Sequence, residues 1–127
     1  MKNNHYKVII QLFFISILLF ACKIDNNLPD PLGAGWNNKA VCELIEENDK
    51  IRVLKCTFEP DVGHEKHYHK PHFGYAIAGS KFRIKDASGT REVTATTGSH
   101  FYSEGTEWHE ILNIGDSTAV YLIIEPK

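Results

Sequence analysis

The sequence lacks several features that would place it in other protein classes. No stretch keeps apolar residues at a 3.6-residue period over three turns, so we expect almost no helix. No run of lysine or arginine occurs in this chain of formal net charge −2, which argues against a nucleic-acid partner. Internal repeats and low-complexity tracts are absent as well. The chain is long enough for one domain and no more.

The only long apolar run lies near the N-terminus and is too short to span a bilayer. It extends from Val8 to Phe20, whereas a spanning helix needs about 20 apolar residues. Lys2 and Lys7 precede the run, and the small residue Ala21 ends it. This layout predicts a secretory signal peptide over residues 1–21.

The end of that run, Leu19-Phe20-Ala21-Cys22, resembles the bacterial lipobox, in which the cysteine is lipidated and becomes the first residue of the mature chain. The resemblance implies a lipoprotein that is exported to the cell envelope, periplasmic or surface-exposed, and anchored to a membrane through the lipid on Cys22. An ordinary cleaved signal and an uncleaved anchor are the alternatives. All three readings export the domain.

Cleavage after Ala21 would leave a small acidic domain. It removes Lys2 and Lys7 and no acidic residue, so the formal net charge falls from −2 to about −4. A chain of this size buries about two-thirds of its unfolded surface, which suffices for one core without disulfide staples. Residues 22–35, with their Asn, Pro and Gly, predict a lipidated N-terminus and a flexible tether of roughly 20 Å. Residues 36–127 form the predicted domain.

Short runs rich in β-branched and aromatic residues recur along this domain, separated by turn residues such as Ser88-Gly89 and Gly115-Asp116. We expect about eight strands, at residues 40–45, 51–58, 73–78, 81–85, 91–96, 99–102, 108–112 and 118–124. So many short strands in one small domain indicate an all-β jelly roll or a related barrel. Cys42 and Cys56 lie on neighbouring runs, where export permits a disulfide and buried free thiols are the alternative.

Histidine placement is the most informative feature of the chain. His64, His67, His69 and His72 fall close together, and His109 follows near the end. His67 and His69 are two residues apart, so in an extended segment both side chains point to the same face. A metal ion also needs ligands from a second strand, and His109 is the candidate. The pattern favours a metal site over a set of solvated loop histidines.

Between Asn48 and Lys127 the chain resembles the cupin superfamily, in particular its short single-domain members of type 2. In the first of the two cupin motifs, His67-Tyr68-His69 stands at the His-x-His position and Gly79 closes the motif. Asp61 stands where the motif opens with glycine.

The second cupin motif is matched at three positions. Gly98, His109 and Asn113 fall at its spacings, while Glu104 and Thr106 replace a proline and a glycine. The resemblance implies a double-stranded β-helix, or jelly-roll barrel, with one metal ion on its histidines. It also implies a homodimer that pairs through its sheets.

The glutamate of the first motif has no counterpart in this sequence. Counting back from Gly79 puts His72 at that position, and counting forward from His69 puts Phe73 there, because the segment is one residue short. With His72 in register, Gly74 and Ala76 would share its face and leave open volume beside the metal. We favour this register, which makes His67, His69, His72 and His109 the predicted ligands. The alternative register keeps three histidines and makes Phe73 part of the pocket wall.

The predicted cofactor is one transition metal ion, Fe, Zn, Cu or Ni, because these metals suit neutral imidazole ligands. We expect a small-molecule ligand in the barrel beside the metal, with no reaction identified. A metal-dependent enzyme of the dioxygenase or isomerase type is the alternative, since a shared fold does not confer a shared function. No catalytic residue can be named, although Glu65, Glu104, Glu107 and Glu110 lie near the motifs.

Three further residues have weaker predicted roles. We expect His64 to be a solvated loop residue at the pocket mouth and His100 to be an ordinary packing or surface residue, because it lies off the motif spacing. Tyr102 precedes the turn that leads to His109, and it is the predicted aromatic wall of the pocket.

Overall fold

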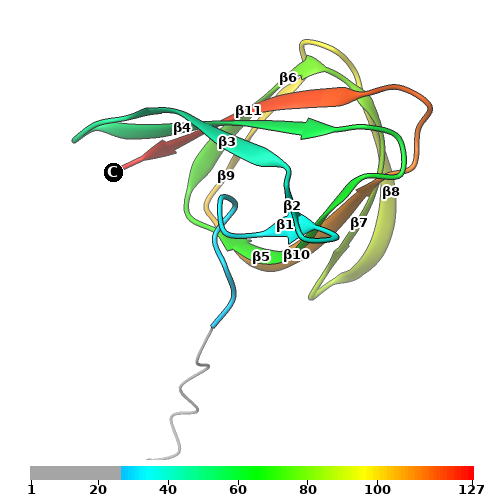
Figure 1. Ribbon diagram of the computed structural model, residues 1–127, viewed down its shortest axis with the longest axis horizontal. Helices are drawn as coiled ribbons and strands as arrows, with labels where there is room; N and C mark the ends of the chain where they lie inside the picture. Colours follow the sequence, from blue (N-terminus) through cyan, green and yellow to red (C-terminus); the bar gives the residue numbers. More distant parts are fainter. Residues whose placement is uncertain (1–26) are drawn as a thin grey trace, which may run out of the picture.

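The computed structural model describes residues 27–127, which fold into β-strands without a helix (Figure 1). The predicted signal peptide over residues 1–21 and the predicted lipid-bearing Cys22 lie outside the described residues. Within the described part, no helix is long and apolar enough to cross a membrane.

The described residues contain eleven strands, which are β1 (Gly35–Trp36), β2 (Lys39–Ala40), β3 (Cys42–Glu47), β4 (Ile51–Phe58), β5 (Gly63–His69), β6 (His72–Ala78), β7 (Ser80–Asp86), β8 (Gly89–Ala95), β9 (His100–Ser103), β10 (Thr106–Asn113) and β11 (Ala119–Pro126). The predicted runs correspond to β3, β4 and β6 to β11. Strands β1, β2 and β5 were not among them.

Two antiparallel sheets face each other and enclose the interior of the domain (Figure 1). One has the order β5-β10-β7-β8 and the other the order β3-β4-β11-β6-β9. Strands far apart in the sequence are therefore neighbours, as where β11 lies between β4 and β6. The predicted all-β jelly-roll fold is confirmed.

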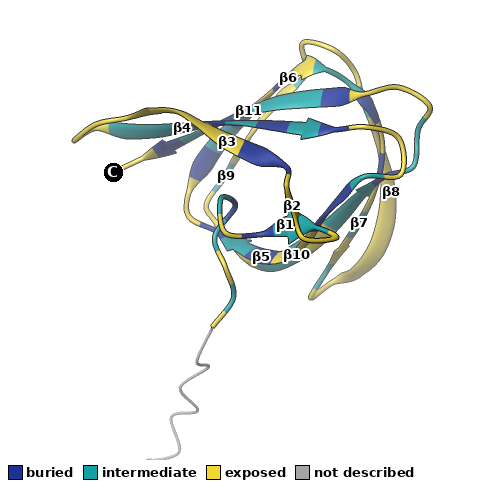
Figure 2. Cartoon of the chain, in the orientation of Figure 1, coloured by how far each residue is buried: buried dark blue, intermediate teal, exposed yellow. Residues whose placement is uncertain are grey.

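The core follows from the alternation of side chains along the strands. On β4, Leu54, Cys56 and Phe58 are buried, and the residues between them face outward (Figure 2). Phe82 of β7 and Ile123 of β11 complete the same cluster from both sheets. Strand β8 lies at an edge of the four-stranded sheet and is exposed over nearly its whole length (Figure 2).

Asn113, the asparagine of the second motif, has a structural role at one end of the barrel. Its side chain is fully buried, and its Nδ2 donates to the carbonyl oxygens of Phe58 at 2.9 Å and Ser117 at 2.8 Å. Its Oδ1 accepts a hydrogen bond from Ser80 Oγ at 2.8 Å and one from the Gly115 amide at 3.0 Å. One amide side chain thus ties the ends of three strands to the turn before β11, which offsets the cost of burying it.

The two cysteines form a disulfide, whereas the sequence left either a disulfide or buried free thiols open. Cys42 of β3 and Cys56 of β4 are directly opposed in the sheet and bonded to each other. Both are buried in the core cluster.

The boundary of the folded domain differs from the prediction. Residues 22–35 were expected to be a flexible tether, but Pro31 and Ala34 are buried, and the Tyr68 amide donates to the Pro29 carbonyl at 3.2 Å. Asp30 forms an ion pair with Arg52 of β4 at 2.7 Å. Residues 29–35 therefore belong to the domain, because apolar burial and an ion pair hold them on the barrel.

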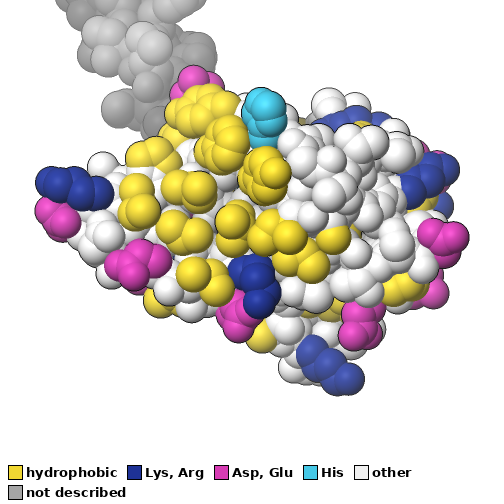
Figure 3. Space-filling model, turned by 90° about the horizontal axis from the view of Figure 1, so that it is seen from above, with side chains coloured by type: hydrophobic (Ala, Val, Ile, Leu, Met, Phe, Trp, Pro, Cys, Tyr) yellow, Lys and Arg dark blue, Asp and Glu magenta, His cyan; other side chains and the backbone are white. Residues whose placement is uncertain are grey.

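The outer face of the five-stranded sheet is unusually apolar. Tyr75, Ile77 and Tyr102 are 40%, 44% and 58% exposed, and Figure 3, which looks onto the molecule from above the view of Figure 1, shows hydrophobic side chains gathered there. Contiguous apolar surface of this kind is characteristic of interaction sites. The homodimer implied by the cupin resemblance stays a prediction, and this face is the surface that would serve it.

Candidate metal centre

Strands β5 and β10 bring the histidines together through two irregularities in their pairing. His67 is the cross-strand partner of His109, and His69 pairs with Thr106. His64 pairs with Ile111, so the two residues of β5 between His64 and His67 lie opposite the single residue Glu110 of β10, which is a β-bulge. The bulge turns His64 inward together with His67, although strict alternation would put them on opposite faces. This is why His64 is 2% exposed and not the solvated loop residue that we predicted.

Three imidazole nitrogens converge at the centre of this cluster. His67 Nε2 lies 3.0 Å from His69 Nε2 and 3.0 Å from His109 Nε2. The three side chains each offer a ligand atom within 4.8 Å of the others. His67 is fully buried, His69 is 7% exposed and His109 is partly buried.

The hydrogen bonds around the cluster fix the state of the central imidazole. His67 Nδ1 donates to the Glu65 carbonyl oxygen at 2.6 Å, so in the neutral ring the lone pair is on Nε2. That lone pair faces two other Nε2 atoms, and it can accept only one good hydrogen bond. A cation placed among the three nitrogens would satisfy all of them at once. The donor set of three neutral imidazoles therefore fits a transition metal ion.

Burial keeps these imidazoles neutral. It lowers the pKa of His109 to about 3, with the nearby histidines adding to the effect. Burial likewise lowers the pKa of His67 and strongly lowers that of His69. A metal ligand must be deprotonated, so at neutral pH the three nitrogens are in the state that binds a cation.

His72 faces the interior but does not belong to the converging group. His72 is 3% exposed, and Gly74 and Ala76, which share its inward face, are buried as well. Phe73 is turned away from this face. The register that we favoured is thus the one found. The His72 ring stacks on that of His69, with 4.4 Å between the ring centroids, and His72 Nδ1 donates to the Lys70 carbonyl oxygen at 2.8 Å. The structure gathers three of the four predicted ligands, with His72 beside them.

A cavity of about 550 Å³ opens from the histidines into the barrel. Most of its wall is aromatic or aliphatic, contributed by Phe58, Phe82, Ile84, Phe101, Tyr121 and Ile123. Polar groups are fewer and include Arg91, Thr94, Ser99, Ser103 and Thr106. A cavity of this size and lining fits a small, mainly apolar molecule.

The aromatic wall predicted at Tyr102 is supplied by its neighbour. Tyr102 is 58% exposed on the outer face of β9, and Phe101 lines the cavity and packs against His72. Phe101 can do so because Gly74 has no side chain: a Cβ there would lie 2.4 Å from the Phe101 ring. None of the four glutamates near the motifs, Glu65, Glu104, Glu107 and Glu110, lines the cavity. His100 is exposed and stacks on Phe73, as expected of a surface residue.

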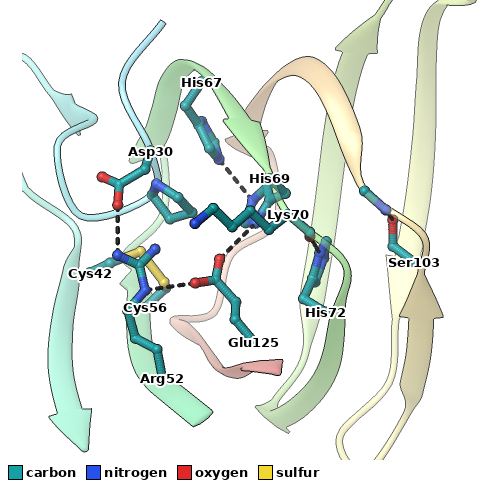
Figure 4. A network of polar contacts seen from close by, with 12 residues as sticks. Asp30, Cys42, Arg52, Cys56, His67, His69, Lys70, His72, Ser103 and Glu125 are labelled. Atoms are coloured by element: carbon teal, nitrogen blue, oxygen red, sulfur yellow. Dashed lines mark hydrogen bonds and ion pairs between the residues drawn. A yellow bond between two sulfur atoms is a disulfide. The ribbon is translucent and has the colours of Figure 1, made fainter. Parts of the chain in front are cut away.

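One charged residue at the site was missed by the sequence analysis. Glu125 of β11 is 3% exposed, and its Oε2 accepts a hydrogen bond from Arg52 Nε at 2.6 Å (Figure 4). Its other oxygen, Oε1, lies 3.9 Å from His69 Nδ1. Alternation along β11 puts Glu125 on the same inward face as Tyr121 and Ile123. A glutamate at an inward position of a strand could therefore have been recognised in the sequence as a candidate site residue.

Comparison with known proteins shows the fold. No protein-family model matches the sequence, and no curated protein sequence does. A cupin domain from Bordetella pertussis Tohama I is 18% identical with a TM-score of 0.65, and the match covers 68% of this chain and 92% of that one. The polyketide cyclase RemF from Streptomyces resistomycificus is 17% identical with a TM-score of 0.53, covering 67% of this chain and 63% of the cyclase.

A cupin superfamily protein from Desulfitobacterium hafniense DCB-2 is 9% identical, with a TM-score of 0.52 and coverage of 67% and 74% of the two chains. At these identities the likeness concerns the backbone. The domain has the cupin fold, and its candidate site is a cluster of three buried histidines inside the barrel.

The neutral, buried histidines should make the metal-free domain sensitive to mild acid. Burial lowers the pKa of His64 and His109 to about 3, below their ordinary value of 6.5, so the unfolded chain binds more protons than the folded one below pH 6.5. Stability is therefore full above that pH and is lost as the pH falls, by up to about 1.4 kcal/mol per pH unit for each histidine. Urea denaturation of the metal-free domain should show a lower midpoint at pH 5 than at pH 7. Equal midpoints would contradict the burial of neutral imidazoles.

Proposed function

We propose that this domain is a member of the cupin superfamily that holds one transition metal ion on His67, His69 and His109 and binds a small, mainly apolar molecule beside it at the cell envelope. The observation that carries the proposal is the convergence of three Nε2 atoms, with His67 Nε2 at 3.0 Å from each of the other two. No other group of three potential ligands comes together in residues 27–127.

The ligand chemistry narrows the choice of metal. Neutral imidazole suits Fe, Zn, Cu and Ni, whereas Mg and Ca prefer oxygen ligands, and no carboxylate belongs to the converging group. Three protein ligands leave coordination positions open, as in sites where a metal contacts water or a small molecule. The three histidines line the cavity, so a molecule in the cavity would lie next to the ion.

The lining of the cavity supports an apolar ligand. Aromatic and aliphatic side chains from both sheets form most of the wall, and the hydrophobic effect favours an occupant that removes them from water. The few hydroxyl groups, from residues such as Ser103 and Thr106, can orient a polar substituent.

A metal-dependent enzyme is the second candidate function, and His72 is the observation that favours it. Its Nδ1 proton is held by the Lys70 carbonyl, which leaves the lone pair on Nε2, and the side chain lines the cavity beside His69. An imidazole nitrogen that lines the cavity is placed to exchange a proton with a bound molecule. The metal, when bound, would supply Lewis-acid chemistry there.

Replacing a ligand histidine should remove the metal. The test uses an untagged domain from Asn27 to Lys127, because residues 29–35 are part of the fold. Elemental analysis should find about one metal ion per chain in the parent. His67→Ala and His109→Ala should lower the affinity by more than the roughly 10–100-fold that follows loss of an outer-shell partner.

Two variants serve as controls for the metal measurement. His100→Ala removes an exposed imidazole outside the site, and His72→Gln removes one beside it. Both should keep the metal of the parent. A parent that holds no metal after reconstitution with Fe, Zn, Cu or Ni would refute the proposal, and loss of metal in His72→Gln would add His72 to the ligands.

Filling the cavity should abolish binding of an apolar probe without affecting the metal. Val93 lines the cavity and is 39% exposed, so Val93→Trp can place an indole in the opening without disturbing the core. In amide NMR spectra, added indole should perturb inward residues such as Phe82 and Ile123 in the parent and not in the variant. Val120→Trp, on the outward face of β11, should bind as the parent does. Perturbation confined to the outer sheet face would contradict the ligand site.

Membrane attachment through Cys22 is tested on the full chain in a bacterial host. Cys22→Ser should lose incorporation of labelled palmitate and leave the membrane fraction, because the proposed attachment is through the lipid on that cysteine. Cys42→Ser, which removes a cysteine of the disulfide, should keep the label. Continued membrane association of Cys22→Ser would indicate an uncleaved anchor instead.

A further inference from the structure

Two buried polar atoms beside the metal centre face each other without any hydrogen-bond partner. They are His69 Nδ1 and Glu125 Oε1, which lie 3.9 Å apart, and both side chains are at most 5% exposed (Figure 4). A buried polar atom that makes no hydrogen bond is costly, and in native proteins such atoms are rare. Here the two atoms are complementary, since a ring N–H donates and a carboxylate accepts.

The Nδ1 atom of His69 differs from those of His67 and His72 in its surroundings. His67 and His72 each donate their Nδ1 proton to a backbone carbonyl oxygen, at 2.6 Å and 2.8 Å. His69 Nδ1 has no such carbonyl, and Glu125 stands where the acceptor is needed. The gap of 3.9 Å is about 1 Å longer than a charge-assisted hydrogen bond, so forming that bond requires the imidazole and the carboxylate to approach each other by about that amount.

Glu125 is itself held in place from the side away from His69. Arg52 Nε donates to Glu125 Oε2 at 2.6 Å, and the same guanidinium reaches Asp30 Oδ2 at 2.7 Å. Burial alone would lower the pKa of Arg52, but its hydrogen bonds to Glu125 and Asp30 outweigh burial and raise that pKa. The cation is therefore permanent, and it compensates the buried carboxylate while leaving Oε1 free to face the imidazole.

We propose that Glu125 is a positioning residue for the metal centre: it accepts the Nδ1 proton of His69 and thereby keeps the Nε2 lone pair directed at the metal. The inference rests on the proposed metal site and adds a residue that lies on another strand and touches no metal. Outer-shell acceptors of this kind fix the tautomer and orientation of a metal-bound histidine.

Glu125→Gln tests the role because Arg52 decides how the amide must turn. Arg52 Nε donates to Oε2, so the amide oxygen has to face Arg52, and the amide NH₂ then faces His69 Nδ1. A donor at that place favours the proton on His69 Nε2, which is the wrong tautomer for binding a cation. We expect metal affinity, measured by competition with a chelator, to fall about 10–100-fold. The visible ligand-field bands of the Co²⁺-loaded domain should change as well.

Asp30→Asn is the matched control. It weakens the other ion pair of Arg52 but leaves the Glu125 carboxylate opposite His69. We expect its metal affinity to stay within about threefold of the parent and its Co²⁺ spectrum to be unchanged. An equal loss of affinity in Asp30→Asn and Glu125→Gln would show a general structural effect and overturn the role of Glu125.

The double variant Arg52→Met/Glu125→Gln separates positioning from packing. Without Arg52 the amide can turn its oxygen toward His69, so metal affinity should recover part of what Glu125→Gln lost; a purely structural role predicts a further loss. The double variant also replaces the buried ion pair by neutral groups, a change that proteins often tolerate. Its metal affinity can therefore be measured even if Glu125→Gln alone does not fold. Parent-like affinity and spectrum in Glu125→Gln would refute the role while the metal site stands. A parent that binds no metal would refute both.

Discussion

The burial of neutral imidazoles between β5 and β10 is the constraint on which the rest of the site depends. His64, His67 and His69 occupy inward positions that a barrel strand ordinarily fills with apolar residues. Each imidazole has a polar nitrogen at both ends of the ring, so each must find partners inside the domain. Backbone carbonyls bind one nitrogen of His64 and one of His67, and Glu125 faces Nδ1 of His69. The Nε2 atoms of His67 and His69 converge with that of His109.

Some of these partners come from the segment that precedes the first strand. Pro31 lies before the first strand, and its carbonyl accepts a hydrogen bond from His64 Nε2 at 3.0 Å. Asp30 of the same segment forms an ion pair with Arg52, whose Nε separately donates to Glu125 (Figure 4). The N-terminal segment thus has two contacts with the barrel, one to His64 and one to Arg52. A domain trimmed at residue 36, the predicted boundary, would lose both.

Strand content and fold class could be predicted from the sequence because they rest on local patterns. The inward and outward alternation of β4 is visible in the residues themselves. The spacing of Gly98, His109 and Asn113 matches the second cupin motif, and that resemblance implied the barrel. Strand β5 was missed because its inward residues are histidines, so the hydrophobic pattern that marks a strand is absent. Asp61 replaces the motif glycine and has a φ of 64°, a left-handed conformation that aspartate tolerates better than most residues.

Three of the four histidines predicted as ligands converge in the structure, whereas the residues around them were not predicted, for a physical reason. The pair His67-x-His69 and the spacing to His109 are properties of strands, and the three residues do converge. The inward turn of His64 depends on a β-bulge, and the pairing of Glu125 with His69 depends on strand order, with β11 between β4 and β6. Neither register shifts nor strand order can be read from one sequence. The same reason applies to His72, which lies beside the three converging histidines and not among them.

Anomalous X-ray diffraction from crystals of the Asn27–Lys127 domain, grown with the metal that it retains and recorded at that metal's absorption edge, tests the central claim most directly. The account predicts one anomalous peak per chain, about 2.0–2.1 Å from the Nε2 atoms of His67, His69 and His109 if the metal is zinc. A fully ordered barrel with no peak among these three nitrogens, or with the peak at surface residues only, would contradict it.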